Sequence, residues 1–154
     1  MVTWKEFAKA DPGLAEAGSN HLFQYGVGLA FLATVRGDGS PRLHPVCPVL
    51  SSARLYLLLR PRSPKRWDLE RDGRYALQAF PQARPDSDEF YLSGTAHLVK
   101  DTKKCKAVLA DAKHAASPDE IPFELLIERA MRTIWEGFGT PEYHSIHTVW
   151  KPTT

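Results

Sequence analysis

The chain has 154 residues, with 20 Lys and Arg against 18 Asp and Glu, so its formal net charge is only +2. This near-neutral balance gives no general case for a nucleic-acid partner or an anionic membrane. Cys47 and Cys105 are too few cysteines for a disulfide framework, so a reducing cytoplasm is the expected compartment. No apolar run approaches the ~18 residues of a membrane span, and the first residues lack the apolar core of a signal peptide. A chain of this length is expected to form a single domain with a substantial core.

The N-terminal part reads as a helical segment over residues 3–25. Thr3 and Glu6 have the spacing of a capping box, which predicts a short helix. Asp11 followed by Pro12 predicts the start of a second helix, because Asp is a good N-cap and Pro suits the first helical position. Gly26 is expected to end it.

An early hairpin is predicted next. Residues 27–35 are nearly all apolar, as in a buried strand, and the Asp-Gly within 36–40 favours a tight turn. Residues 41–50 form the return strand but contain three prolines, which cannot donate to a sheet ladder. This strand is therefore expected to be an edge, to be bulged, or to pair only in places. An edge at a ligand site would leave free backbone groups facing the ligand.

The rest of the chain alternates strands with helices. Further strands are predicted at 55–60, 75–80, 89–99 and 146–150, an exposed loop at 81–88, and helices at 64–71 and 101–116. Residues 123–135 are ambiguous, because their apolar residues follow helical spacing while some also alternate. About six strands with peripheral helices predict a mainly β fold, a mostly antiparallel barrel.

Cations crowd the predicted helix start at Ser63 and Pro64. A helix N-terminus carries a partial positive charge and unpaired N–H groups, so cations there suggest a bound anion such as a phosphate. The alternative is a solvated basic loop. The cations concerned are Arg60, Arg62, Lys65 and Arg66.

Several motifs in this order resemble the pyridoxamine 5′-phosphate oxidase-like flavin-binding split-barrel family. The resemblance implies a six-stranded antiparallel split β-barrel over residues 27–150, within one FMN-binding domain spanning 1–154. It also implies a homodimer with FMN at the interface, and strand rather than helix over 123–135. The motifs are Ala-Phe-Leu-Ala-Thr-Val at 30–35, Asp-Gly-Ser-Pro at 38–41, Leu-His-Pro-Val at 43–46, Ser-Pro-Lys-Arg-Trp-Asp-Leu at 63–69 and Arg-Asp-Gly-Arg-Tyr-Ala-Leu at 71–77.

The same resemblance nominates cofactor-binding residues. Ser63 and Lys65 would hold the flavin phosphate, and Arg66 would supply the cation that Pro64 replaces in the family pattern, with Arg62 or Arg60 as alternatives. The strand carrying Arg42, Leu43, His44 and Val46 would line the isoalloxazine. Glu89 stands where the oxidases often have Gln, and His147 and Trp150 would cover the flavin from the partner subunit. For His44 a purely structural strand position, and for Trp150 core packing, are the alternatives.

The C-terminus bears on activity. True oxidases of the family carry an Arg-x-His motif there, whereas this chain has His147 and Lys151 without it. The resemblance therefore implies an FMN-dependent oxidoreductase of unknown small-molecule substrate, other than a pyridoxamine phosphate oxidase, with no catalytic residue assigned. A deazaflavin-dependent reductase, or a flavin- or haem-binding module without turnover, are the alternatives. His144 and His147 lie near Glu142, but nothing completes a metal site, and none is expected.

Overall fold

The computed structural model describes residues 1–84 and 88–153, so part of the predicted 81–88 loop lies outside the described residues. The described chain forms one eight-stranded sheet in which every strand pair is antiparallel. The strands are β1 (Ala30–Val35), β2 (Pro41–Val46), β3 (Pro48–Ser51), β4 (Arg54–Leu59), β5 (Arg74–Ala79), β6 (Glu89–Leu98), β7 (Ile121–Glu136) and β8 (His144–Trp150).

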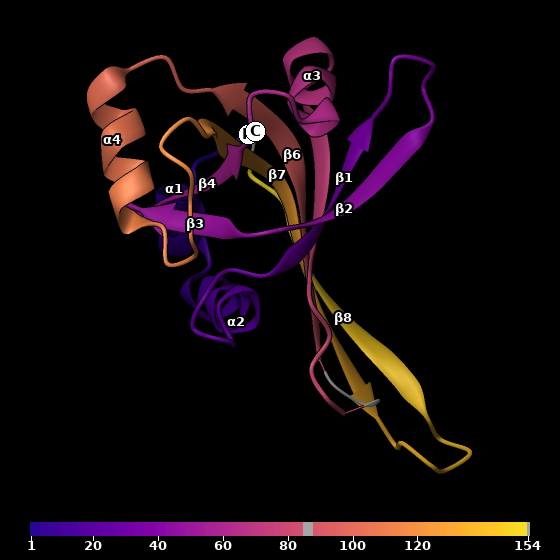
Figure 1. Cartoon of the computed structure of the whole chain (residues 1–154). Coiled ribbons are helices and arrows are strands. Elements are labelled where there is room, and N and C mark those ends of the chain that lie inside the picture. The colour runs from indigo at the N-terminus through magenta and orange to yellow at the C-terminus, as the bar shows by residue number, and fades with distance from the viewer. Residues whose placement is uncertain (85–87, 154) are drawn as a thin grey trace.

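The sheet curls into an open barrel (Figure 1). Its strand order is β2-β1-β5-β6-β7-β4-β3, with β8 paired to β7 off this path. The two strands that end the path, β2 and β3, are consecutive in the chain and only Cys47 separates them. The return strand predicted over 41–50 is thus two strands at opposite ends of the path, and the count is eight rather than six. The prolines explain the split, since strand ends and edges are where missing N–H donors cost least.

The described residues also form four helices, which pack around the sheet. They are α1 (Trp4–Ala10), α2 (Pro12–Leu22), α3 (Pro64–Arg71) and α4 (Thr102–Asp111). The capping box of Thr3 and Glu6 is present, and Asp11 caps α2 through the backbone N–H of Leu14. Helix α2 ends at Leu22, before Gly26, and α4 ends at Asp111 rather than 116. In Figure 1, α1, α2 and α4 lie on one side of the sheet and α3 stands beside the β1–β2 hairpin.

The core lies between the curled sheet and the N-terminal helices. Phe7 of α1, Leu22 of α2, Phe90 of β6 and Phe123 of β7 are fully buried there. Gly94 marks a bulge between β6 and β7, and a Cβ at this position would lie 1.9 Å from the carbonyl oxygen of Leu126. Only glycine permits this close approach of the two backbones, which bends the sheet.

Strand β7 settles the ambiguity over residues 123–135. The helical periodicity was misleading, and the strand that the family resemblance implied is present. Phe123, Leu125 and Ile127 are buried at every second position, but the next buried apolar residue is Ala130. The step of three falls where the β6–β7 register shifts. A bulge therefore imitated the i, i+3 spacing of a helix.

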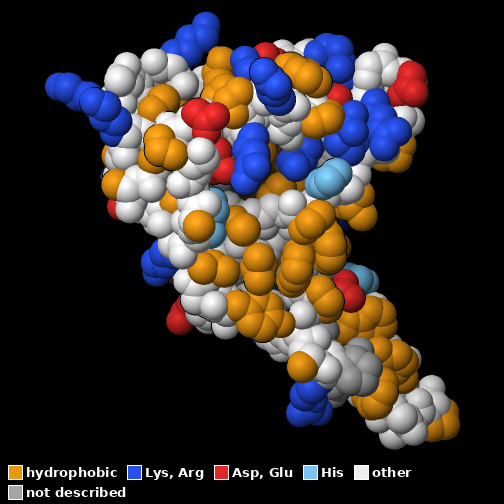
Figure 2. Space-filling view, in the orientation of Figure 1, with side chains coloured by type: hydrophobic (Ala, Val, Ile, Leu, Met, Phe, Trp, Pro, Cys, Tyr) orange, Lys and Arg blue, Asp and Glu red, His pale blue; other side chains and the backbone are white. Residues whose placement is uncertain are grey.

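The β7–β8 hairpin extends away from the body of the molecule (Figure 1). Trp135 stacks on Tyr143 with ring centroids 5.2 Å apart, and Phe138 meets Tyr143 edge-on at 5.6 Å. Hydrophobic side chains continue from the middle of the molecule onto this hairpin (Figure 2). No helix in the described ranges is long and apolar enough to cross a membrane.

Candidate cofactor site

A cavity of about 440 Å³ opens where the two ends of the strand path meet the start of α3. Its volume is within the ~300–1,000 Å³ range of ligand pockets, unlike a second cavity of about 220 Å³ beside α2 and β3. Lys and Arg side chains gather over α3 and the tip of the β1–β2 hairpin (Figure 2). The residues lining the larger cavity are Pro45, Val46, Cys47, Leu58, Leu59, Arg60, Arg62, Ser63, Lys65, His114 and Glu120.

Lys65 is a partly buried cation in the wall of this cavity. Its side chain is half-buried, and burial first and the neighbouring charge of Arg42 second lower the pKa of its ammonium group. Among residues 1–84 and 88–153, no carboxylate lies within ion-pair distance of Lys65. A buried charge without a counterion is costly, so an anion bound beside it would remove that cost.

Ser63 offers a hydroxyl at the same place. It is the N-cap of α3 and has extended backbone, but its side chain makes no capping hydrogen bond. Pro64 follows at the first helical position and has no N–H to donate. The Ser63 hydroxyl, the Lys65 ammonium and the exposed Arg62 guanidinium therefore provide a set of donors suited to a phosphate.

Arg66 is turned away from the cavity. Its Nε donates to Glu70 at 2.7 Å, and another guanidinium nitrogen donates to the carbonyl oxygen of Pro61 at 2.9 Å. Of the predicted phosphate ligands, the structure brings Ser63 and Lys65 together. The cations nominated as alternatives, Arg60 and Arg62, line the cavity instead of Arg66.

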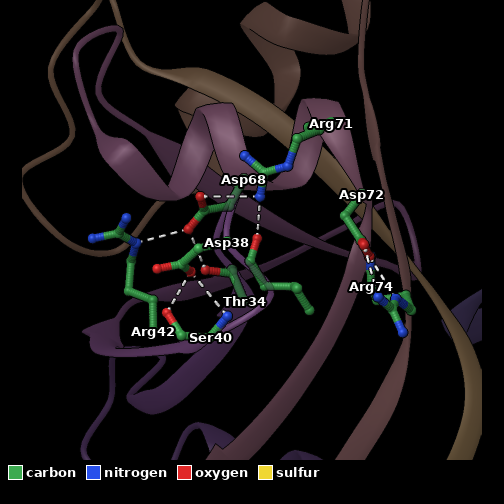
Figure 3. A network of polar contacts seen from close by, with 9 residues as sticks. Thr34, Asp38, Ser40, Arg42, Asp68, Arg71, Asp72 and Arg74 are labelled. Carbon is green, nitrogen blue, oxygen red and sulfur yellow. Dashed lines mark hydrogen bonds and ion pairs between the residues drawn. The ribbon is translucent and has the colours of Figure 1, made fainter.

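Asp68 holds the neighbouring elements in place, a role that the sequence analysis missed. This carboxylate on α3 is only 4% exposed and accepts hydrogen bonds from Thr34 Oγ1 at 2.8 Å and Arg42 Nε at 2.7 Å (Figure 3). Arg71 lies 3.4 Å from its other oxygen and also donates to the carbonyl of Val35. Burial raises the pKa of Asp68, but the hydrogen bonds from Arg42 and Thr34 lower it more. In the sequence, this role of Asp68 was indicated only by an acidic residue in the predicted helix 64–71, after the cations that precede it.

Strand β2 presents a free edge. Within residues 1–84 and 88–153 it pairs with β1 alone, and Val46 at its end is buried against the cavity. Leu43 is 65% exposed and His44 is also exposed. Arg42 is held toward α3 by Asp68. The backbone edge predicted at a ligand site thus borders the cavity.

The remaining nominated residues lie elsewhere in the same chain. Glu89 begins β6 and accepts a hydrogen bond from Trp135 Nε1 at 3.3 Å. His147 on β8 is hydrogen-bonded to Thr133 at 3.0 Å. Trp150 packs on Phe7, with ring centroids 4.8 Å apart, which is the packing role considered as its alternative. None of the three nominated residues lines the cavity.

Cys47 and the pair His114 and Glu120 complete the cavity wall. Burial first and the Glu120 carboxylate second raise the pKa of the Cys47 thiol. This thiol therefore stays protonated at neutral pH, unlike an activated nucleophile. His114 and Glu120 belong to the loop between α4 and β7, where no sequence motif marked them.

Comparisons with known proteins bear on the fold. No family model matches the chain, and no curated protein matches it. Solved structures do match. A Lactobacillus delbrueckii protein named "putative pyridoxamine 5′-phosphate oxidase" is 26% identical, with a TM-score of 0.59 over 75% of this chain and 90% of its own. A NimC/NimA family protein from Clostridium acetobutylicum is 16% identical, with a TM-score of 0.57 over 96% and 95% of the two chains.

A third solved structure has a similar fold. It is a heme binding protein from Mycobacterium smegmatis, 20% identical, with a TM-score of 0.61. The match covers 86% of this chain but 57% of that protein. The curled antiparallel sheet with its flanking helices, together with these neighbours, shows that the chain has the split-barrel fold of the pyridoxamine 5′-phosphate oxidase-like proteins.

Proposed function

We propose that this protein binds FMN and acts as a flavin-dependent oxidoreductase on a small molecule. The observation that carries the proposal is Lys65, a half-buried ammonium group in the cavity without a carboxylate partner among the described residues. Ser63 adds an uncapped hydroxyl beside it. A half-buried cation without a carboxylate partner, next to a hydroxyl that makes no capping hydrogen bond, is an environment that a phosphate monoester would stabilise.

The cavity and the adjoining edge of β2 suit the two ends of a flavin nucleotide. Ser63, Lys65 and Arg62 would hold the phosphate. The edge of β2 from Arg42 to Val46, of which Pro45 and Val46 line the cavity, would offer backbone groups to the ring system. When bound, the flavin would supply the hydride or electron chemistry, and the protein would anchor it and set its electrostatics. Asp68 would fix the position of α3 relative to Arg42 and Thr34 through its hydrogen bonds to both.

The proposal includes a homodimer with the flavin at its interface. The β7–β8 hairpin exposes Phe138, Ile146 and Val149, and β2 exposes Leu43. Apolar side chains gathered on an exposed surface are typical of a contact between protein chains. Glu89 and His147 lie outside the cavity of their own chain, so they would reach a flavin only from a second copy. Sedimentation equilibrium at micromolar concentration would test this, and a monomer there would contradict it.

A deazaflavin coenzyme is the second candidate, and a specific observation favours it. Arg60 and Arg62 line the same cavity as Lys65, and these additional cations could hold a longer anionic tail. Parallel titrations with FMN and with the deazaflavin coenzyme would separate the candidates. The neighbour named as a heme binding protein makes haem a third probe, for which an absorbance band near the Soret position would be the readout.

The first experiment is an absorbance spectrum of the purified protein before and after addition of FMN, followed by a fluorescence titration. Lys65→Ala is expected to weaken FMN binding roughly 10- to 150-fold, because a charge-assisted hydrogen bond contributes about 1.5–3 kcal/mol. Lys9→Ala is the matched control, since Lys9 is exposed on α1. Unchanged affinity in Lys65→Ala would remove this residue from the site.

Turnover needs its own measurement. Reduction of the bound flavin by NADH or NADPH and its reoxidation by an acceptor would distinguish an oxidoreductase from a binding module. Flavin that binds but is reduced by neither nucleotide would favour the module. The proposal keeps the expectation of a cytoplasmic protein, which rests on the low number of cysteines.

A further inference from the structure

Among the described residues that line the cavity, Glu120 is the one whose charge opposes a phosphate. Its side chain is 10% exposed and lines the same cavity as Lys65 and Ser63. One of its carboxylate oxygens, Oε2, is buried and has no hydrogen-bond partner. Burying a carboxylate oxygen without a hydrogen bond costs free energy, so a hydrogen-bond donor placed beside this oxygen would stabilise the structure.

The neighbours of Glu120 do not fill that need. His114 Nε2 lies 3.8 Å from Oε2, and Arg60 Nε lies 3.9 Å from Oε1. Both separations exceed a hydrogen bond. The two side chains flank the carboxylate without satisfying it, and because Glu120 lines the cavity, a ligand bound there would lie against this side chain.

We infer that Glu120 accepts a hydrogen bond from a hydroxyl or N–H group of the cavity's occupant and thereby selects phosphorylated ligands that carry such donors next to the phosphate. A polyol phosphate chain has this chemistry, because its hydroxyls follow the phosphate directly. A ligand that presents only acceptors would leave Glu120 unsatisfied and would also meet its negative charge. This inference rests on the proposed phosphate site at Lys65, and it makes Glu120 a specificity-determining residue.

The test uses two small probes, ribitol 5-phosphate and n-pentyl phosphate. Both carry a phosphate on five carbons, and only the first has hydroxyl donors along the chain. Affinities would be measured by chemical-shift titration of the full chain. The wild type is expected to prefer ribitol 5-phosphate by about tenfold or more, the effect of one hydrogen bond to a charged group.

Two variants of Glu120 sharpen the test. Glu120→Gln keeps a neutral acceptor and is expected to reduce the preference, whereas Glu120→Met removes the acceptor and is expected to abolish it. Inorganic phosphate is expected to bind both variants as well as the wild type or more tightly, because a repelling charge has gone. This opposite response separates loss of a specific contact from damage to the site, and thermal unfolding checks that each variant is folded.

The outcomes are distinct from those of the flavin proposal. A wild type that ignores FMN but prefers ribitol 5-phosphate through Glu120 would refute the flavin proposal and support this inference. Equal affinities for the two probes, no binding of either, or a preference that survives in Glu120→Met would overturn the inference. Those results would leave FMN binding and the effect of Lys65→Ala to be judged separately.

Discussion

The substitution Asp68→Asn tests how α3 is fixed to the β1–β2 hairpin. Asn has nearly the same shape but no charge, and its amide nitrogen cannot accept a hydrogen bond. Arg42 at 2.7 Å and the buried Thr34 hydroxyl at 2.8 Å both donate to one oxygen of Asp68, so the amide oxygen of Asn can take its place. Both hydrogen bonds then lose the negative charge of their acceptor. Arg71 is 45% exposed and 3.4 Å away, so its pair adds little.

These contacts determine how much stability Asp68→Asn is expected to lose. A hydrogen bond to a charged group contributes about 1.5–3 kcal/mol and a neutral one about 1 kcal/mol. Two hydrogen bonds weaken in this way and the partly buried Arg42 loses its counterion, so Asp68→Asn should cost about 2–4 kcal/mol. For a domain of this size that corresponds to a fall in Tm of roughly 6–12 °C. Thermal unfolding followed by near-ultraviolet circular dichroism at pH 7 measures it.

Acid titration supplies a second readout. The pKa of Asp68 is lowered in the folded state, so its contribution is present above the unfolded pKa of about 3.9. That contribution is lost as the pH falls through the lower folded pKa. The difference in Tm between wild type and Asp68→Asn should therefore shrink below about pH 4.

Asp72→Asn is the matched control. Asp72 is partly exposed beside the exposed Arg74, and their hydrogen bond, the largest cause, lowers the pKa of Asp72 to about 2. Because solvent screens this pair, its loss should leave the Tm close to the wild-type value. Equal shifts for Asp68→Asn and Asp72→Asn, or a difference independent of pH, would refute the reasoning about Asp68.

Three further predictions concern other parts of the molecule. FMN binding should weaken as the pH rises through the lowered pKa of Lys65, whereas Lys65→Arg should retain affinity there; identical alkaline profiles by fluorescence titration would contradict this. Cys47 should react with a disulfide reagent at pH 8 more slowly than free cysteine, as followed by absorbance, because its thiol pKa is raised; a faster reaction would show an activated thiol. Gly94→Ala should cost about 1–3 kcal/mol or more in denaturant unfolding, because its Cβ would collide with Leu126. Gly13→Ala, whose Cβ would meet only Asp11 at 4.0 Å, should cost nothing, and equal costs would contradict the argument from close approach.

Most of the helices and strands could be predicted from local signals in the sequence. The cap at Thr3, the Asp11-Pro12 start and the Ser63-Pro64 start each depend on neighbouring residues, and all three helices begin where these signals stand. The bulge at Gly94 was not visible, since it depends on how two strands distant in sequence come into register. For this reason the spacing of apolar residues left β7 ambiguous between a helix and a strand.

The candidate site was predictable only in part. The cations at the start of α3 could be found because they lie close together in sequence, and Ser63 and Lys65 do line one cavity. Arg66 could not be separated from Arg62 without knowing that Glu70 and Pro61 hold it. Glu120 and His114 enter the cavity from a loop that begins about fifty residues farther along the chain. Contacts of that kind are set by tertiary packing and leave no local pattern.

The one-residue link at Cys47 has a mechanical consequence. The sheet path starts at β2 and finishes at β3, so a single peptide unit closes the circuit and limits how far these strands can separate. Release of a ligand by separation of these two strands would strain the covalent link. Lengthening the link by inserted glycines should therefore accelerate ligand release.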